Sequence, residues 1–230
     1  MKLVLLPGLH GTADLFQPFA QALPGWIDPQ VIAYPTHEKL SYTELAEYVM
    51  QRLPGEDDYV LLGESFSGPV VHAVALRAPP RLRGAVFVAT FLSNPRPWTG
   101  LLVRVLPKAR LLELIGPRPF VKAFTFGIDV SDELVRQFLD TVNTVAPEVL
   151  AFRLDEIQRL RAAPRHCALP AIYLRPTGDR LLPPSCVDEF RAVMDNLIVR
   201  PVAGPHFILQ WDPVGCARIV SAQMEAWTRL

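Results

Sequence analysis

Several features that mark particular protein classes are missing from this 230-residue chain. Its 23 Lys and Arg residues balance 23 Asp and Glu residues, so the strongly basic surface of a nucleic-acid-binding domain is excluded. Intrinsic disorder is excluded too, because 50% of the residues are apolar and a chain of this size can bury a large core. These absences leave a globular protein of one large domain, or of one domain with an insertion.

Cysteine is scarce, and long apolar runs are absent near the start. The only cysteines are Cys167, Cys186 and Cys216, an odd number without a Cys-x-x-Cys spacing. We expect them to be buried small apolar side chains in a reducing compartment, not a disulfide framework. The first apolar run, Leu3 to Leu6, is too short for a signal peptide or a membrane span. We therefore expect a cytoplasmic protein.

Short apolar runs alternate with helical patterns over most of the chain. The runs that predict strands cover residues 2–6, 30–34, 59–62, 84–89, 171–175 and 197–202. The predicted helices cover residues 12–22, 41–53, 65–78, 184–194 and 213–228, with Thr12 and either Ser41 or Thr43 as N-caps. Such alternation predicts an α/β fold, with a mostly parallel, doubly wound sheet and helices on both faces.

The alternation is interrupted between residues 91 and 164. This region lacks a convincing strand and contains helical patterns at residues 131–145 and 147–160. We predict a core of residues 1–90 and 165–230 with a helical lid inserted at 91–164. Basic residues outnumber the single Glu113 in its first half: Arg96, Arg104, Lys108, Arg110, Arg118 and Lys122. A solvated helical face explains them, and recognition of an acidic carrier protein or an anionic substrate tail is the alternative.

A serine lies where the third predicted strand meets the next helix. The segment Gly63-Glu64-Ser65-Phe66-Ser67-Gly68 follows an apolar strand, and its small residues let the strand and helix backbones converge at a strained turn. The helix N-terminus favours negative charge developing on the serine hydroxyl. The segment is close to the G-x-S-x-G nucleophile elbow, from which it departs at Ser67. We predict that Ser65 is a nucleophile; a structural turn is the alternative.

A serine nucleophile needs a base, and the base needs an orienting group. His206 follows the last predicted strand, and Asp179 follows the strand before it. Because parallel strands end at a common edge of the sheet, both side chains should meet Ser65 there. We predict that His206 is the base and Asp179 the orienting acid. Asp155 and Asp188 fall within predicted helices and are weaker candidates.

The intermediate of acyl transfer also needs two backbone N–H donors around its negative oxygen. Phe66, directly after Ser65, would supply one donor. Leu9, in the loop Pro7-Gly8-Leu9-His10-Gly11 after the first strand, would supply the other. His10 is expected mainly to shape this loop, with contact to substrate as the alternative.

Four motifs together resemble those of the α/β-hydrolase superfamily, in its small esterase and thioesterase type. They are Leu6-Pro7-Gly8-Leu9-His10-Gly11-Thr12, Gly63-Glu64-Ser65-Phe66-Ser67-Gly68, Gly178-Asp179-Arg180 and Gly204-Pro205-His206-Phe207. The order Ser, Asp, His along the chain is also that of this superfamily, although we expect its usual leading hairpin to be missing, since the first strand directly precedes the oxyanion loop. The resemblance covers all of the chain except the lid. It implies an acyl-enzyme mechanism with no metal and no organic cofactor.

The range of expected substrates can be narrowed by comparison with other members of this superfamily. Dehalogenases and epoxide hydrolases have aspartate at the turn apex, where this chain has serine, so we predict cleavage of a carboxylic ester or thioester of a small-to-medium acyl group. Four aromatic residues of the insertion would suit an apolar acyl chain, unless they form the lid core: Trp98, Phe120, Phe124 and Phe126. The carrier-protein methyl esterases of biotin synthesis are similar in size and in their basic helical lid.

Two other functions remain open at this point. An acyltransferase would use the same acyl-enzyme with an alcohol or amine acceptor in place of water. A ligand-binding receptor would keep the fold with little turnover. We expect a small-molecule ester or thioester as the main partner, with no nucleic acid.

Overall fold

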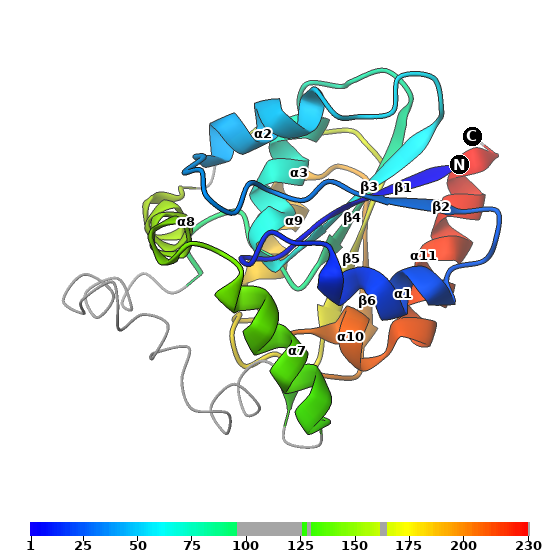
Figure 1. The fold of residues 1–230 in the computed structure, drawn as a ribbon. Helices are drawn as coiled ribbons and strands as arrows, with labels where there is room; N and C mark the ends of the chain where they lie inside the picture. Colours follow the sequence, from blue (N-terminus) through cyan, green and yellow to red (C-terminus); the bar gives the residue numbers. More distant parts are fainter. Residues whose placement is uncertain (96–125, 128–129, 162–164, 230) are drawn as a thin grey trace.

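The computed structural model describes residues 1–95, 126–127, 130–161 and 165–229, and a six-stranded sheet lies at its centre (Figure 1). The strands are β1 (Lys2–Leu6), β2 (Asp28–Val31), β3 (Tyr59–Glu64), β4 (Leu82–Val88), β5 (Ala171–Pro176) and β6 (Leu197–Val202). They lie in the order β2-β1-β3-β4-β5-β6, and each neighbouring pair is parallel. The predicted α/β class is thereby confirmed.

Helices cover both faces of the sheet, because successive side chains of a strand point to opposite faces. Val4 and Leu61 belong to the core on one face, and Leu3 and Val60 to the core on the other. The first face is covered by α2 (Tyr42–Met50), α3 (Gly68–Ala75) and α9 (Cys186–Val193). The second face is covered by α1 (Gln17–Ala22), α10 (Ile208–Trp211) and α11 (Pro213–Thr228). All three cysteines are buried, and none forms a disulfide within the described residues, as expected.

The strand order reverses at β1. This strand pairs with β2 on one side and with β3 on the other, so the chain leaves β1 in one direction across the sheet and later continues in the other. A crevice forms at such a switch point, outside the carboxyl ends of the strands. The loop after β1 and the turn after β3 both lie at these carboxyl ends.

The long segment between β4 and β5 is an insertion between two strands that pair directly, since Ala85 lies opposite Ala171. Its described helices are α7 (Asp132–Asn143), which Ser131 caps, and α8 (Pro147–Arg159). Phe138 and Val149 of these helices pack with Leu15 and Phe207, which follow β1 and β6. The insertion therefore contacts the carboxyl edge of the sheet. No helix within the described residues has the length and hydrophobicity to cross a membrane.

Two local predictions were wrong. The second strand spans Asp28–Val31 instead of residues 30–34: it is an edge strand, partly exposed, so its apolar residues do not mark its limits. Thr12 does not cap the first helix, because its backbone N–H and hydroxyl both contact the His10 ring. A 3-10 turn at Asp14–Phe16 precedes α1 instead. The capping box at Ser41, by contrast, is present.

Candidate active site

Ser65 is at the apex of a strained turn between β3 and α3. Its φ is +51°, a left-handed conformation that costs a non-glycine residue on the order of 1–3 kcal/mol. The turn is tight because a Cβ on Gly63 would lie 2.6 Å from Val71 and 2.9 Å from the Ser67 carbonyl. Strand and helix can cross this closely only with glycine at position 63. The local geometry is thus that of the predicted nucleophile elbow.

His206 connects Ser65 to Asp179 through two hydrogen bonds. Its Nε2 lies 2.9 Å from the Ser65 hydroxyl oxygen, and its Nδ1 lies 2.8 Å from Asp179 Oδ2. An ionised carboxylate can only accept, so the proton sits on Nδ1 and the Nε2 lone pair faces the serine hydroxyl. The side chains of His206 and Asp179 are both shielded from solvent, with exposed fractions of 3% and 9%.

The turn that carries Asp179 favours its ionised form. Burial opposes ionisation, but the neighbouring charge and hydrogen bond of His206 and the backbone N–H groups of Leu182 and Leu181 outweigh it and lower the carboxyl pKa. Both N–H groups donate to Asp179 Oδ1, at 2.8 and 2.9 Å. The loops after β5 and β6 are also joined directly, because the Gly178 N–H donates to the Gly204 carbonyl at 2.9 Å.

Thr90, just past the end of β4, is a supporting residue that sequence reasoning missed. Its hydroxyl donates to the Ser65 carbonyl and accepts from the Gly68 N–H at 3.1 Å. A Cβ at Gly68 would lie 2.1 Å from this hydroxyl, so glycine is required there. Ser67, at the usual glycine position of the elbow, has an ordinary right-handed φ of −85°. In this chain, therefore, position 68 requires glycine and position 67 does not.

The predicted oxyanion donors belong to two segments near Ser65, the turn that follows it and the loop after β1. Phe66 is in the first turn of the helix, where backbone N–H groups have no acceptor within the helix. The Leu9 N–H donates no hydrogen bond within the described residues. A Cβ placed on Gly8 would lie 3.8 Å from the Ser65 Cβ, so the loop after β1 runs directly beside the serine.

His10 contacts Thr12 within this loop through its ring, and the residue is 2% exposed. The Thr12 N–H donates to its Nδ1 at 3.2 Å, so the ring proton sits on Nε2. That Nε2 is buried and has no hydrogen-bond partner. Burial, and then the nearby charge of Arg153, lower the pKa of His10 to about 4. The ring is therefore neutral at physiological pH.

Of the four aromatic residues predicted to bind an acyl chain, the structure describes one. Phe126 is fully buried and stacks on Phe207 at a centroid distance of 4.6 Å, next to His206. Trp98, Phe120 and Phe124 lie outside the described residues. The basic residues predicted to form a solvated face, or alternatively to bind an acidic carrier or an anionic substrate tail, also lie outside the described residues: Arg96, Arg104, Lys108, Arg110, Arg118 and Lys122.

Glu64, directly before the serine, is a second buried acid that sequence reasoning left unassigned. It is 1% exposed, and one carboxyl oxygen has no hydrogen-bond partner. The other is 3.5 Å from the Gln210 amide nitrogen. Burial raises the pKa of Glu64 to about 7, against smaller opposing effects of His206 and Gln210.

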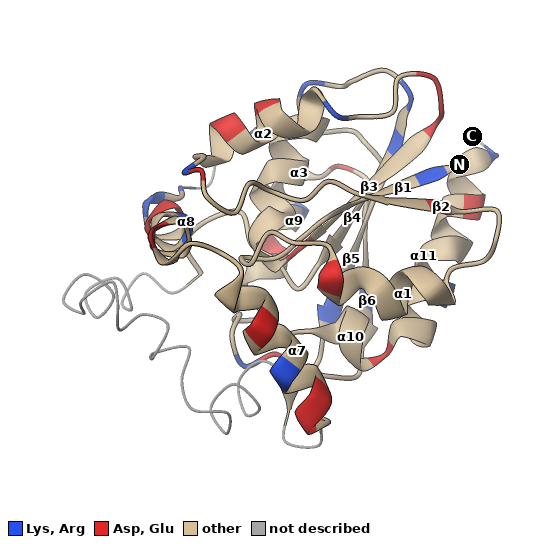
Figure 2. Ribbon diagram, viewed as in Figure 1, with Lys and Arg blue, Asp and Glu red and all other residues tan. Residues whose placement is uncertain are grey.

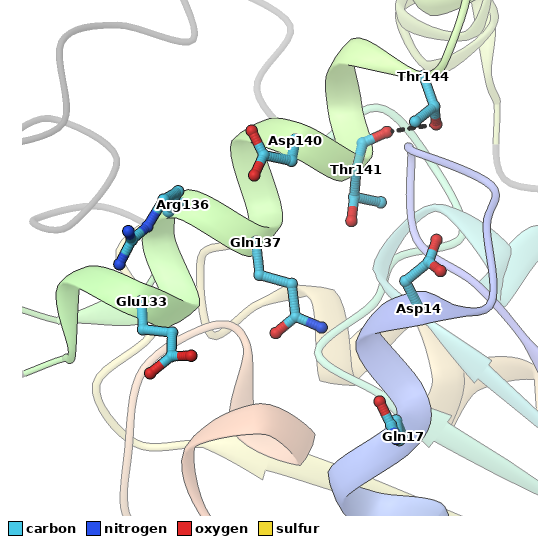
Figure 3. A pocket seen from close by; sticks show the side chains of 8 residues that line it. All are labelled: Asp14, Gln17, Glu133, Arg136, Gln137, Asp140, Thr141 and Thr144. Atoms are coloured by element: carbon cyan, nitrogen blue, oxygen red, sulfur yellow. Dashed lines mark hydrogen bonds between the residues drawn. The ribbon is translucent and has the colours of Figure 1, made fainter.

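A polar cleft of about 740 Å³ opens between α7 and the segment that leads into α1 (Figure 3). Asp14, Glu133 and Asp140 line it, with Arg136 as the basic residue on the same helix face. Acidic residues recur along α7 (Figure 2). None of Ser65, Asp179 and His206 lines the cleft, and its polarity does not suit an acyl chain. The cleft is therefore not assigned to the chemistry predicted for these three residues.

No protein-family model and no curated protein sequence matches the chain. Among solved structures, it is similar to the RedJ thioesterase from the prodiginine biosynthetic pathway in Streptomyces coelicolor, with 22% identity, a TM-score of 0.70 and coverage of 100% of this chain and 90% of that chain. The type II thioesterase BorB from the borrelidin biosynthetic cluster has 20% identity, a TM-score of 0.70 and coverage of 96% and 91%. A Paleococcus ferrophilus monoacylglycerol lipase has 16% identity, a TM-score of 0.71 and coverage of 98% and 94%. These likenesses establish the α/β-hydrolase fold.

Proposed function

We propose that the protein is a serine hydrolase that cleaves a carboxylic ester or thioester through an acyl-enzyme. One observation carries the proposal: the hydrogen-bonded series Ser65–His206–Asp179, with distances of 2.9 and 2.8 Å, at the apex of the strained turn. A structural turn would have no need of a buried histidine aligned between a hydroxyl and a carboxylate. The fold shared with solved thioesterases and a lipase supports the same reaction class.

In the acylation step, the Ser65 oxygen attacks the carbonyl carbon of the substrate while His206 Nε2 takes the hydroxyl proton. Asp179 holds the ring in orientation and stabilises the imidazolium. The negative oxygen of the tetrahedral intermediate accepts hydrogen bonds from the backbone N–H groups of Leu9 and Phe66. His206 then gives its proton to the departing alcohol or thiol, which leaves Ser65 acylated.

Deacylation repeats these steps with water in place of the serine hydroxyl. His206 takes a proton from water, the hydroxide attacks the acyl carbon, and Ser65 regains its proton as the acid leaves. The insertion at residues 91–164 would cover the acyl group as a lid over the core of residues 1–90 and 165–230. Two of the similar structures are named thioesterases of biosynthetic pathways, so carrier-bound thioesters belong among the substrates to be tested.

The test is hydrolysis of p-nitrophenyl esters from acetate to decanoate, and of acyl thioesters of matching length, by the wild type and Ser65→Ala. Loss of one member of such a triad should lower kcat by about 10⁴-fold or more. Ser221→Ala, a substitution on the distant helix α11, is the matched control and should retain activity. The preferred acyl length would then report the size of the pocket.

Two results would contradict the proposal. Equal, feeble turnover by wild type and Ser65→Ala would favour a ligand-binding receptor on this fold. Acyl transfer to an added alcohol or amine that outcompetes hydrolysis would instead identify an acyltransferase with the same acyl-enzyme. Product analysis with and without the acceptor separates the latter from hydrolysis.

A further inference from the structure

Arg153, on helix α8 of the insertion, is a buried cation without an acidic partner among the described residues. Its side chain lies in the interior, with the residue 2% exposed. Nη1 donates to the Leu9 carbonyl at 2.8 Å, and Nη2 donates to the Pro35 carbonyl at 2.9 Å. Burial lowers the pKa of Arg153 to about 10, so the guanidinium keeps its charge at neutral pH. A buried charge is costly to desolvate, which makes its placement against two carbonyls notable.

The loop that Arg153 contacts is the one that carries the proposed Leu9 donor. Four carbonyls of this loop are occupied by different donors. Ser67 donates its hydroxyl to Pro7, the Gly11 N–H donates to Gly8 at 3.0 Å, and the Tyr34 N–H donates to Gly11 at 2.7 Å. Arg153 holds the fourth, the Leu9 carbonyl. With these carbonyls turned into the protein, the Leu9 N–H is left as an unused donor beside Ser65.

Gly11 shows how closely the guanidinium fits. A Cβ at this position would lie 2.5 Å from Arg153 Nη1, and the residue has a φ of +79°. The loop therefore turns around the guanidinium in a conformation that favours glycine. The fork geometry matters as well: arginine can reach the Leu9 and Pro35 carbonyls together, whereas a lysine ammonium is a single point.

We propose that Arg153 is a positioning residue that fixes the oxyanion donor of Leu9, and that helix α8 of the insertion thereby controls catalysis from outside the sheet. The inference rests on the proposed function, because an oxyanion site matters only if an acyl group is transferred. It assigns a role to the insertion that differs from covering the substrate. Movement of α8 would shift the Leu9 carbonyl and, with it, the loop that carries the donor.

The kinetic test compares Arg153→Met, Arg153→Lys and the control Arg159→Met, an exposed arginine on the same helix. We expect kcat of Arg153→Met to fall by about 10- to 100-fold, less than the loss of roughly 10²–10³ when a donor is removed outright. KM should stay within about twofold, because the donor acts on the transition state. Arg153→Lys, which can keep one of the two contacts, should be intermediate. Arg159→Met should match the wild type.

A trifluoromethyl ketone separates positioning from a general structural defect. It adds to the serine and places a negative oxygen at the oxyanion site, so its Ki should rise by the same factor by which kcat/KM falls. Unchanged affinity for the ketone in a folded Arg153→Met, with thermal unfolding monitored alongside, would overturn the role.

Hydrogen exchange of the loop gives a readout that needs no turnover. The Gly11 and Tyr34 N–H groups should exchange at least about tenfold faster in Arg153→Met, because local opening controls such exchange. Unchanged exchange rates would show that Arg153 does not hold the loop, even if the enzyme is active. A different result is possible if the wild type is inactive but exchange in the loop is faster in Arg153→Met. This result would overturn the proposed function and the catalytic role of Arg153. It would still establish that Arg153 holds the loop.

Discussion

Two carboxylic acids, Asp179 and Glu64, lie near His206 at the carboxyl edge of the sheet, and their surroundings shift their pKa values in opposite directions. Asp179 has an accepted hydrogen bond on each oxygen, two of the donors being backbone N–H groups. Glu64 has a single contact of 3.5 Å and one oxygen without a partner. The pKa is lowered at Asp179, where the charge and hydrogen bonds outweigh burial, and is raised to about 7 at Glu64, where burial prevails.

The difference shows that burial alone does not decide whether an acid near the nucleophile is charged. A carboxylate needs donors to replace the water that it loses. The turn after β5 supplies them to Asp179. The region between β3 and α10 offers Glu64 only the Gln210 amide, which also donates to the Leu15 carbonyl at 3.2 Å. We therefore expect the first acid to matter for turnover and the second mainly for the pH dependence of stability.

The largest effect should come from Asp179→Asn. The amide no longer fixes the Nδ1 proton of His206, so the wrong tautomer becomes accessible and kcat should fall by about 10⁴-fold. The measurement is kcat on the preferred ester, with circular dichroism to confirm the fold. Asp188→Asn, an exposed aspartate paired with Arg191 on α9, is the control. A loss below about tenfold at Asp179, against the expectation from such triads, would remove it as the orienting acid.

The sequence was enough to predict the side chains that lie directly after the ends of strands at this edge of the sheet. Ser65, Asp179 and His206 were each placed just after an apolar run, and parallel strands bring such positions together whatever lies between them. The strands β1 and β6 match their predicted ranges. Helix α2 was predicted with Ser41 or Thr43 as its N-cap, and Ser41 caps it through a local capping box.

Residues that act through packing were not predicted. Arg153 follows Val149 and Leu150 at helical spacing, so it lies on the apolar side of α8, a signal that could have marked it as buried. Its partner carbonyls at Leu9 and Pro35, however, are set by tertiary packing. The burial of Glu64 and the contact of Thr90 with the elbow likewise follow from how neighbouring elements approach, which no local pattern contains.

A smaller effect should come from Glu64→Gln, measured as the free energy of unfolding against pH. Between the ordinary pKa of 4.5 and the folded value of about 7, the folded protein keeps a proton that the unfolded chain releases. Wild-type stability from this group is therefore lost as the pH rises through that window. At 1.36 kcal/mol per pKa unit, the variant should gain about 3 kcal/mol over the wild type between pH 4.5 and pH 8.

The quantity to compare is the difference in the free energy of unfolding between variant and wild type, measured by urea unfolding at several pH values. His10 has a lowered pKa of about 4, so its contribution rises with pH over part of the same range. That contribution is present in both proteins and cancels in the difference. Glu133→Gln, an exposed glutamate on α7, serves as the control. A difference that does not change with pH would show that Glu64 is ionised throughout.

The smallest expected effect is that of Gln210→Leu, which removes the donor that Glu64 has among the described residues. The hydrogen bond from Gln210 lowers the Glu64 pKa against the larger effect of burial, so its loss should push that pKa further upward. At 3.5 Å the contact is long, and we expect an extra loss of about 1 kcal/mol or less on going from pH 5 to pH 8. The Leu15 carbonyl also loses its donor, which destabilises the variant equally at both pH values. The pH-dependent part therefore isolates the effect on Glu64, and a smaller loss in the variant than in the wild type would mean that Gln210 does not stabilise the carboxylate.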